Sequence, residues 1–452
     1  MFRTALNDLK QWFSSQSRKP LVIRGARQVG KTWLVRELAR SNKLNLIEIN
    51  FELEPTKKTL FTDNDPKKVL IALEVSLGKQ IQLNNTLLFL DEIQAFPLIL
   101  AKLRWFKELM PELAVIVAGS LLEFVLDKHD FSMPVGRISY LHLEPLSFDE
   151  FLYAKNSKML DFLNEYNWEE IPPAIHQQAL AYLQEYTLVG GLPAAMSVWL
   201  EQNSLIAVQQ IHHDILSTYR DDFARYKGRY DIQLFDDVFN YVPKNIGHKV
   251  IYSHISLNAS AASTKQIFQL ITKARVIHTI RASSGNGIPL AAESNDKYIK
   301  TISLDVGLMN RILGINLHDF KSVSDIEVIH KGAIAEQLVG QLLRTIEPYY
   351  IEPALYYWQR SEAGSNAEVD YLIQQGSKII PIEVKAGTRG TMQSLHLFMK
   401  LKQLPTAIRF NANTPSRMKI EAKTSSGEVQ YQLLSLPLYM VGQLRRLLEQ
   451  NA

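Results

Sequence analysis

Gly25-Ala26-Arg27-Gln28-Val29-Gly30-Lys31-Thr32 matches the pattern Gly-x-x-x-x-Gly-Lys-[Ser/Thr] at every fixed position. An apolar run at 20–23, which predicts a short buried strand, precedes it, and the apolar spacing of 33–40 predicts a helix after it. A glycine-rich loop between strand and helix lets backbone N–H groups and a helix N-terminus face one phosphate group. The alternative is a glycine-containing turn that matches by chance.

In such a loop every residue from Gly25 to Thr32 lines the phosphate site. The two glycines allow the backbone to turn and approach the phosphate oxygens closely. The Lys31 ammonium is expected to reach the β and γ phosphates of ATP, and the Thr32 hydroxyl to bind Mg²⁺. The stretch therefore predicts a nucleotide site that uses ATP and Mg²⁺.

A second strand supplies the acids that this chemistry needs. The apolar run 87–90 ends in Asp91-Glu92, about sixty residues after the loop. At the end of a buried parallel strand, Asp91 is expected to join the Mg²⁺ shell and Glu92 to polarise the attacking water. A solvated acidic turn after a core strand is the alternative.

Two further residues follow in the same part of the chain. The apolar strand predicted at 113–118 leads to Ser120, which could sense the γ-phosphate or cap the next helix. Arg137 opens another predicted strand. It could stabilise transition-state charge, in its own chain or a neighbouring subunit, or it could be a plain surface arginine.

Length and composition limit the classes of protein. The chain has 452 residues, 46% of them hydrophobic and 21% charged, which predicts two or three folded domains. The absence of cysteine excludes disulfides and thiolate sites, and the net charge of +4 permits a nucleic-acid partner without requiring one. No segment has the length and apolarity of a membrane span or a signal peptide, so we expect a cytoplasmic protein without a membrane partner.

Five motifs in order carry a family resemblance: residues 25–32, 90–94, 118–120, 136–137 and 145–148. Together they resemble the bacterial and archaeal AAA-like P-loop ATPases (AAA_14 type) whose C-terminal half is the domain of unknown function DUF4143. The resemblance covers nearly the whole chain. It implies ATP binding, and it makes the Gly-Arg pair that ends in Arg137 a candidate arginine finger.

The middle of the chain predicts a winged helix. A short helix after residue 246, a second helix at 264–272 and strands at 275–280 and 298–304 give the order helix, turn, helix, hairpin. Lys265, Lys273 and Arg275 are then candidates for phosphate contacts with DNA. The alternative is that this element only packs between domains.

The C-terminal part has the spacing of a PD-(D/E)xK nuclease. Asp370 lies thirteen residues before Glu383-Val384-Lys385, each on a predicted strand, and Glu336 lies on a predicted helix upstream. Residues two apart on a strand share a face, so Glu383 and Lys385 point together and Asp370 can converge on them. Asp370 and Glu383 would bind Mg²⁺, Lys385 would activate water, and Glu336 would complete the site. A chance charge pair, or a nuclease fold that has lost cleavage, remains open.

Together, these predictions describe an α/β protein in three parts. We expect an AAA-like ATPase domain with a P-loop NTPase parallel sheet at 1–155, a helical and winged-helix middle at 156–310, and a DUF4143, restriction-endonuclease-like α/β domain at 311–452. The leading hypothesis is a Mg²⁺-dependent ATPase whose nucleotide state controls a nuclease-like domain acting on DNA. The alternative is a nucleotide-dependent switch that binds DNA or a protein partner without cleavage. Assembly into a homo-oligomer stays open.

Overall fold

The computed structural model describes residues 2–119, 134, 136–224, 231–317, 331–362, 365–387 and 390–450. Ser120 and the helix expected directly after it lie outside these ranges. The chain forms two compact units. The first comprises Met1–Glu144 with the short segments Lys273–Arg275 and Pro348–Glu352, and the second comprises the rest of the chain.

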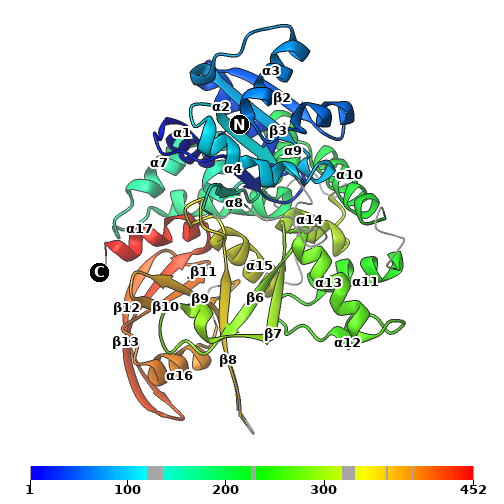
Figure 1. Ribbon diagram of the computed structural model, residues 1–452. Helices are drawn as coiled ribbons and strands as arrows, with labels where there is room; N and C mark the ends of the chain where they lie inside the picture. Colours follow the sequence, from blue (N-terminus) through cyan, green and yellow to red (C-terminus); the bar gives the residue numbers. More distant parts are fainter. Residues whose placement is uncertain are drawn as a thin grey trace. The chain divides into compact units, whose positions relative to one another are not determined.

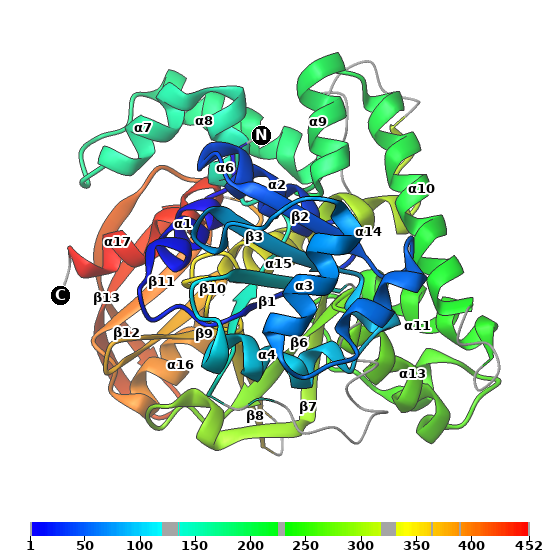
Figure 2. The ribbon, with the colours of Figure 1, turned by 45° about the horizontal axis from the view of Figure 1, so that its top comes forward.

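The first unit is built on a five-stranded sheet in the order β2-β3-β4-β1-β5, in which all neighbouring strands are parallel. The helices around it are drawn in blue and cyan in Figures 1 and 2. The elements are α1 (Ala5–Ser14), β1 (Leu21–Arg24), α2 (Lys31–Ser41), β2 (Asn45–Asn50), η1 (Pro55–Phe61), α3 (Pro66–Leu77), η2 (Leu83–Asn85), β3 (Thr86–Asp91), η3 (Ile93–Ala95), α4 (Ile99–Leu109), β4 (Ala114–Ala118) and β5 (Ser139–His142).

Apolar side chains cover both faces of this sheet, which explains the unbroken apolar runs of its central strands. On one face, alternate strand residues such as Leu88, Leu90 and Val117 pack with α3 and α4 in one core cluster. Strands buried on both faces are typical of parallel sheets. The carboxyl ends of β1 and β3 therefore lie at the same edge, where the glycine-rich loop and the acids follow.

The second unit contains a helical region followed by a mixed, eight-stranded sheet (Figure 1). The helices are α6 (Phe148–Lys155), α7 (Ser157–Glu165), α8 (Pro173–Val189), α9 (Pro193–Gln202), α10 (Leu205–Ala224), α11 (Ile232–Lys244), α12 (Tyr252–Ile255), α13 (Ala261–Lys273), η4 (Leu290–Glu293), α14 (Val306–Ile312), α15 (Lys331–Leu343), α16 (Gln393–Lys402), η7 (Leu438–Gln443) and α17 (Leu444–Glu449). The strands are β6 (Ile277–Ser283), β7 (Ser294–Ser303), β8 (Leu355–Glu362), β9 (Ser365–Gln375), β10 (Lys378–Val384), β11 (Thr406–Asn411), β12 (Ser416–Thr424) and β13 (Gly427–Pro437).

The hairpin expected to be a wing belongs to this large sheet. The strand order is β12-β13-β11-β10-β9-β8-β6-β7, and β6 pairs with β8 in parallel. The elements expected for a winged helix are therefore present in order, but the hairpin extends a larger sheet. One sheet thus runs across residue 310, where the sequence suggested a domain boundary, because strand pairing is not visible in local patterns.

The polar stretch at 411–426 contains a strand. β12 pairs antiparallel with β13 from Ser416 to Thr424, and its residues alternate between exposed and half-buried. It lies at the edge of the sheet, where one face contacts solvent. Polar residues are common at such an edge, so polar composition by itself does not exclude a strand.

A buried carboxylate holds the turn between α8 and α9. Asp305 Oδ2 accepts a hydrogen bond from the Gly191 amide at 2.6 Å, and Oδ1 accepts one from Leu308 at the start of α14 at 3.1 Å. Gly190 has φ +77°, and a Cβ added there would lie 2.0 Å from Asp305 Oδ1. Because the glycines of this turn have no side chain, the Asp305 carboxylate can bind both the turn between α8 and α9 and the start of α14.

Candidate functional site

The loop at 25–30 joins β1 to α2 and requires both of its glycines. A Cβ added to Gly25 would lie 2.4 Å from the backbone oxygen of Leu143, which a side chain cannot approach so closely. Gly30 has φ 95° and ψ 26°, a left-handed conformation that favours glycine, directly before α2 begins at Lys31. The loop therefore ends at a helix N-terminus, which is suited to bind an anion.

The Lys31 side chain folds back over its own loop. Its Nζ donates hydrogen bonds to the backbone oxygens of Gly25 at 3.0 Å and Ala26 at 2.8 Å. The residue is 8% exposed. Two of its partners are thus neutral carbonyls, which a phosphate oxygen could replace as acceptor because charged acceptors make stronger hydrogen bonds.

Thr32 and Asp91 meet although they are far apart in sequence. The Thr32 hydroxyl donates to Asp91 Oδ2 at 2.8 Å, and the amide of Glu92 donates to Asp91 Oδ1 at 2.9 Å. Burial raises the pKa of Asp91, and the hydrogen bond from Thr32 lowers it in part. A hydroxyl and a carboxylate oxygen side by side are ligands that Mg²⁺ accepts.

Glu92 is held by a neighbouring amide. Gln94 Nε2 donates to Glu92 Oε2 at 2.6 Å and to Glu52 Oε1 at 3.0 Å. The backbone of Glu92 is left-handed, with φ 51°, at the end of β3. Gln94 belongs to the motif at 90–94, and its hydrogen bond orients the Glu92 carboxylate.

Arg137 lies at the other end of the sheet. Its Nε donates to Glu108 Oε1 at 3.1 Å, and half of its side chain is exposed. It precedes β5, whose residues Ser139 to His142 pair with β1 from Leu21 to Arg24. The length of β5, at roughly 3.3 Å per residue, thus separates Arg137 from the loop at Gly25. This arrangement does not bring Arg137 to the glycine-rich loop of its own chain.

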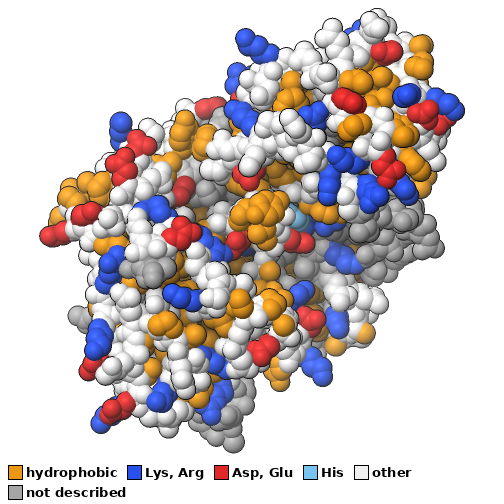
Figure 3. Space-filling view, turned by 60° about the vertical axis from the view of Figure 1, so that its left-hand side comes forward, with side chains coloured by type: hydrophobic (Ala, Val, Ile, Leu, Met, Phe, Trp, Pro, Cys, Tyr) orange, Lys and Arg blue, Asp and Glu red, His pale blue; other side chains and the backbone are white. Residues whose placement is uncertain are grey.

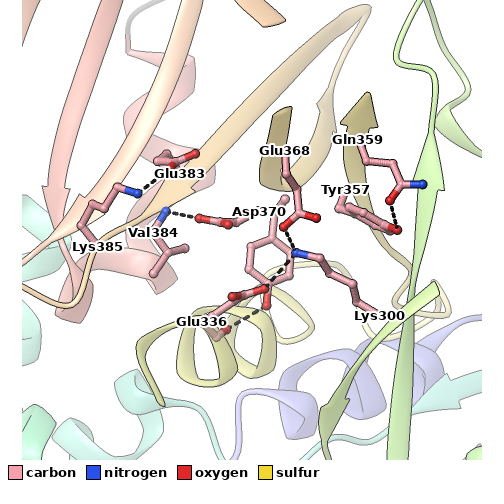
Figure 4. A network of polar contacts seen from close by, with 10 residues as sticks. Lys300, Glu336, Tyr357, Gln359, Glu368, Asp370, Glu383, Val384 and Lys385 are labelled. Carbon is pink, nitrogen blue, oxygen red and sulfur yellow. Dashed lines mark hydrogen bonds and ion pairs between the residues drawn. The ribbon is translucent and has the colours of Figure 1, made fainter. Parts of the chain in front are cut away.

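The C-terminal residues come together on two antiparallel strands. Tyr371 of β9 pairs with Ile382 of β10, so Asp370 and Glu383 follow at adjoining positions. Asp370 Oδ2 accepts a hydrogen bond from the Val384 amide at 2.7 Å, and Lys385 Nζ lies 2.6 Å from Glu383 Oε1. Figure 4 shows the side chains of Glu383 and Lys385 on the same side of β10, with Asp370 beside them.

A bulge in β9 helps to aim these side chains. Tyr356 pairs with Leu372 and Trp358 with Val369, so β9 has one residue more than β8 between these pairs. Val369 and Leu372 both belong to the core cluster that contains α16. The Tyr371 hydroxyl instead donates to the backbone oxygen of Glu336 in α15 at 2.8 Å. Bulges commonly redirect side chains in this way beside functional sites.

Glu336 contacts a lysine from β7, the strand at the edge of the sheet opposite β12. Lys300 of β7 has its Nζ 3.5 Å from Glu336 Oε1 and forms an ion pair with Glu368 Oε1 (Figure 4). The Lys300 side chain is 1% exposed, and its ammonium lies 5.0 Å from the centre of the Tyr357 ring. The cluster therefore pairs the acids of α15 and β9 with a cation from the segment expected to be a separate middle domain.

Burial raises the pKa values of the four acids. The pKa of Glu383 rises to about 8, because burial and the charge of Asp370 outweigh the ion pair with Lys385. The pKa of Glu336 rises to about 7, because burial and its acidic neighbours outweigh Lys300. Burial also raises the pKa values of Asp370 and Glu368. Such shifted groups are typical of functional sites, although structural ion pairs show them too.

Carboxylates converge here without forming a ready three-ligand metal site. Within the described ranges, no group of three or more His, Asp or Glu side chains is arranged to hold a metal ion. Glu383 Oε2, however, is buried and has no hydrogen-bond partner among the described residues. A buried carboxylate oxygen normally has a partner, so this atom is the one that a bound cation would satisfy.

Sequence reasoning missed three contributors to this cluster. They are Lys300, Glu368 and Gly247, at which a Cβ would lie 2.5 Å from Glu336 Oε2. A lysine inside the apolar run Ile299-Lys300-Thr301-Ile302 was the available signal, because a buried charge requires a partner. Nothing in the local sequence indicated which acids would be that partner.

On the face drawn in Figure 3, the described residues do not single out a nucleic-acid interface. Arg275, one of the expected phosphate contacts, is 7% exposed and donates to Glu352 at 2.6 Å. Lys265 is exposed on α13. On the face drawn in Figure 3, basic and acidic side chains of the described residues are interspersed.

Among the described residues, no helix is both long enough and apolar enough to cross a membrane.

Three family models match consecutive parts of the chain. Residues 17–152 match the AAA domain model AAA_14, residues 180–319 match a domain of unknown function, DUF8612, and residues 331–432 match DUF4143. No curated protein matches the chain.

Several solved structures are similar to this one at low sequence identity. The Walker-type ATPase PABY2304 of Pyrococcus abyssi is 14% identical, with a TM-score of 0.42 over 68% of this chain and 94% of its own. The RuvB Holliday junction branch migration motor of Thermotoga maritima is 15% identical, with a TM-score of 0.29 over 62% of this chain and 89% of its own. C. elegans PCH-2 is 12% identical, with a TM-score of 0.29 over 46% of this chain and 69% of its own.

The P-loop, its parallel sheet and the family match agree for the N-terminal part. Residues 17–152 are thus similar to AAA domains of the P-loop type, and residues 331–432 are similar to DUF4143 domains.

Proposed function

We propose that the N-terminal site binds ATP with Mg²⁺ and hydrolyses it. The observation that carries this proposal is the meeting of Lys31, Thr32 and Asp91 at one helix N-terminus, with Thr32 Oγ1 2.8 Å from Asp91 Oδ2. These residues fit a nucleotide-bound Mg²⁺, which Thr32 and Asp91 would hold. When bound, Mg²⁺ neutralises charge on the phosphates.

The residues of this site divide the work among binding, orientation and proton transfer. Lys31 exchanges the carbonyls of Gly25 and Ala26 for phosphate oxygens. The backbone N–H groups of the loop and α2 orient the phosphates. Glu92, oriented by Gln94, accepts the proton of the attacking water at its carboxylate.

The test separates binding from turnover. Lys31→Ala should weaken ATP binding by about 100-fold or more, and Glu92→Gln should keep binding while turnover falls by about the same factor. Lys10→Ala, at an exposed position of α1, is the matched control and should change neither. Retained ATP binding by Lys31→Ala would refute the assignment of the loop.

Arg137 enters this proposal as a residue that acts on a neighbouring subunit. Its position before β5, at the end of the sheet away from the loop, supports this reading. Mixing Arg137→Ala chains with Glu92→Gln chains should then restore turnover, because each chain would supply the residue that the other lacks. Two inactive variants that stay inactive when mixed would refute action on a neighbouring subunit. An Arg137→Ala chain that keeps wild-type turnover by itself would assign Arg137 to the surface, paired with Glu108.

A second candidate function is metal-dependent cleavage of DNA at Asp370, Glu383 and Lys385. It is favoured by the unpartnered, buried Glu383 Oε2 beside Asp370 and Lys385 in the part of the chain that the structure describes. These residues fit one divalent cation, which Asp370 and Glu383 would hold, with Lys385 placed to orient a water. In this reading, the nucleotide state of the N-terminal site controls cleavage.

Cleavage of duplex, single-stranded and branched DNA should depend on Mg²⁺ or Mn²⁺, and it should respond to ATP. Asp370→Asn and Glu383→Gln should abolish it, whereas Glu428→Gln, at an exposed position of β13, should not. If wild-type protein and both variants are equally inert, the chain is better described as a nucleotide-dependent switch. Salt-dependent DNA binding, or capture of a protein partner only with ATP, would then be the relevant activity.

A further inference from the structure

Lys300 lies among the acids of the C-terminal cluster in the place that a cation would take. Its ammonium contacts one carboxylate from α15, Glu336, and one from β9, Glu368. Figure 4 shows the Lys300 side chain ending between them. A lysine ammonium offers three donors and one positive charge at a point, so it can satisfy two carboxylates without water.

The surroundings keep this ammonium charged and fixed. Burial alone would lower the pKa of Lys300, but Glu336 and Glu368 outweigh burial and raise the pKa above its usual value. The Tyr357 ring, 5.0 Å from Nζ, adds a favourable cation–π contact. Gly247 closes the other side of Glu336, where any Cβ would clash with Oε2. These contacts hold Lys300 and Glu336 in one arrangement.

We infer that Lys300 is a built-in cation, which occupies the position between Glu336 and Glu368 and keeps divalent metal ions out of it. A divalent ion bound there would need the same carboxylate oxygens, at about 2.0–2.6 Å, and would lie against the ammonium. Like charges at that distance repel strongly inside a protein. Glu336 is then a partner of Lys300, and divalent binding in the cluster is confined to Asp370 and Glu383.

This inference concerns the same cluster as the second candidate function but does not require cleavage. It predicts a change in the number of metal ions bound, whatever that number is in the wild-type chain. A merely structural lysine would not produce such a change, because its loss would lower stability without creating an ion site. A failure to observe cleavage would therefore leave this inference intact, and an unchanged ion count would leave the proposed cleavage intact.

The experiment counts Mn²⁺ in the nucleotide-free, full-length chain by electron paramagnetic resonance. Lys300→Met keeps most of the apolar stem and removes the ammonium, so it should bind one more Mn²⁺ per chain than wild type. Lys300→Arg keeps the charge and should bind the wild-type number. Lys300→Met/Glu336→Gln should lose the additional ion, because one of its two ligands is gone.

Stability provides the second readout if Lys300→Met folds poorly. Mn²⁺ should restore its folding or raise its Tm more than that of wild type, because an ion that binds only the folded state stabilises it. Equal Mn²⁺ counts in Lys300→Met and wild type would overturn the inference. So would an additional ion that survives Glu336→Gln, or a Lys300→Met chain that stays unfolded at saturating Mn²⁺.

Discussion

The two candidate sites of this chain treat lysine in opposite ways. In the N-terminal site, Lys31 Nζ hydrogen-bonds backbone carbonyls, and the carboxylate of Asp91 is held by the hydroxyl of Thr32. In the C-terminal cluster, Lys300 and Lys385 bind carboxylates directly. Hydrogen bonds from a lysine to neutral carbonyls can be exchanged at small cost, whereas the ion pairs of a buried lysine between two carboxylates cannot. The first site is arranged for an exchanged ligand, and the second for a permanent charge balance.

Removal of the permanent cation should have the largest effect on stability. We expect Lys300→Met to lower the free energy of unfolding by about 3–5 kcal/mol, because it leaves Glu336 and Glu368 close together without their counter-ion. Urea denaturation in the presence of EDTA measures this loss. Lys297→Met, at an exposed position on β7, should change stability by less than about 0.5 kcal/mol. Equal losses in both variants would show that the ion pairs of Lys300 stabilise the fold no more than an exposed lysine does.

The pH dependence of stability tests the charge balance of the same cluster. Burial raises the folded-state pKa of Glu383 from 4.5 to about 8, so the folded chain keeps a proton that the unfolded chain has released. Wild-type stability should therefore fall as pH rises from about 4.5 to about 8.

Glu383→Gln removes this titration and should flatten that fall by on the order of a few kcal/mol, at about 1.4 kcal/mol for each pKa unit. Thermal melts at several pH values measure it, with exposed Glu428→Gln as the control. A decline that is as steep in Glu383→Gln as in wild type would show that Glu383 ionises normally in the folded chain.

The contact between Thr32 and Asp91 should contribute less than the Lys300 ion pairs. Thr32→Val should lower the free energy of unfolding by about 1–2 kcal/mol without nucleotide, because it removes one donor from the buried Asp91 carboxylate. Thr32→Ser keeps the hydroxyl and should recover most of the loss. Chemical denaturation in EDTA measures both variants. A loss as large as that of Lys300→Met would mean that the N-terminal site is equally rigid.

Arg137 should matter least for stability. Its ion pair with Glu108 is half-exposed, so Arg137→Ala should change the free energy of unfolding by less than about 1 kcal/mol. Addition of salt should reduce even this effect, because screening weakens exposed pairs. A larger and salt-insensitive loss would indicate that Arg137 supports the fold of the first unit.

The sequence was sufficient to predict the local structure of the N-terminal candidate site, because its residues are nearly contiguous. Eight residues from Gly25 to Thr32 specify strand, loop and helix, and Asp91-Glu92 ends the only other strand that the assignment needed. The spacing of Asp370, Glu383 and Lys385 likewise identified two neighbouring strands, because residues two apart on a strand share a face.

The tertiary structure was needed wherever a partner comes from a distant strand or helix. Lys300 reaches Glu336 and Glu368 only because β6 and β7 extend the sheet that contains β9, and no local pattern specifies which strands pair across it. Long-range contacts also decide that Arg137 lies away from the loop at Gly25 and that Arg275 is buried against Glu352. Local periodicity determines which residues are buried, whereas long-range pairing determines which charges meet.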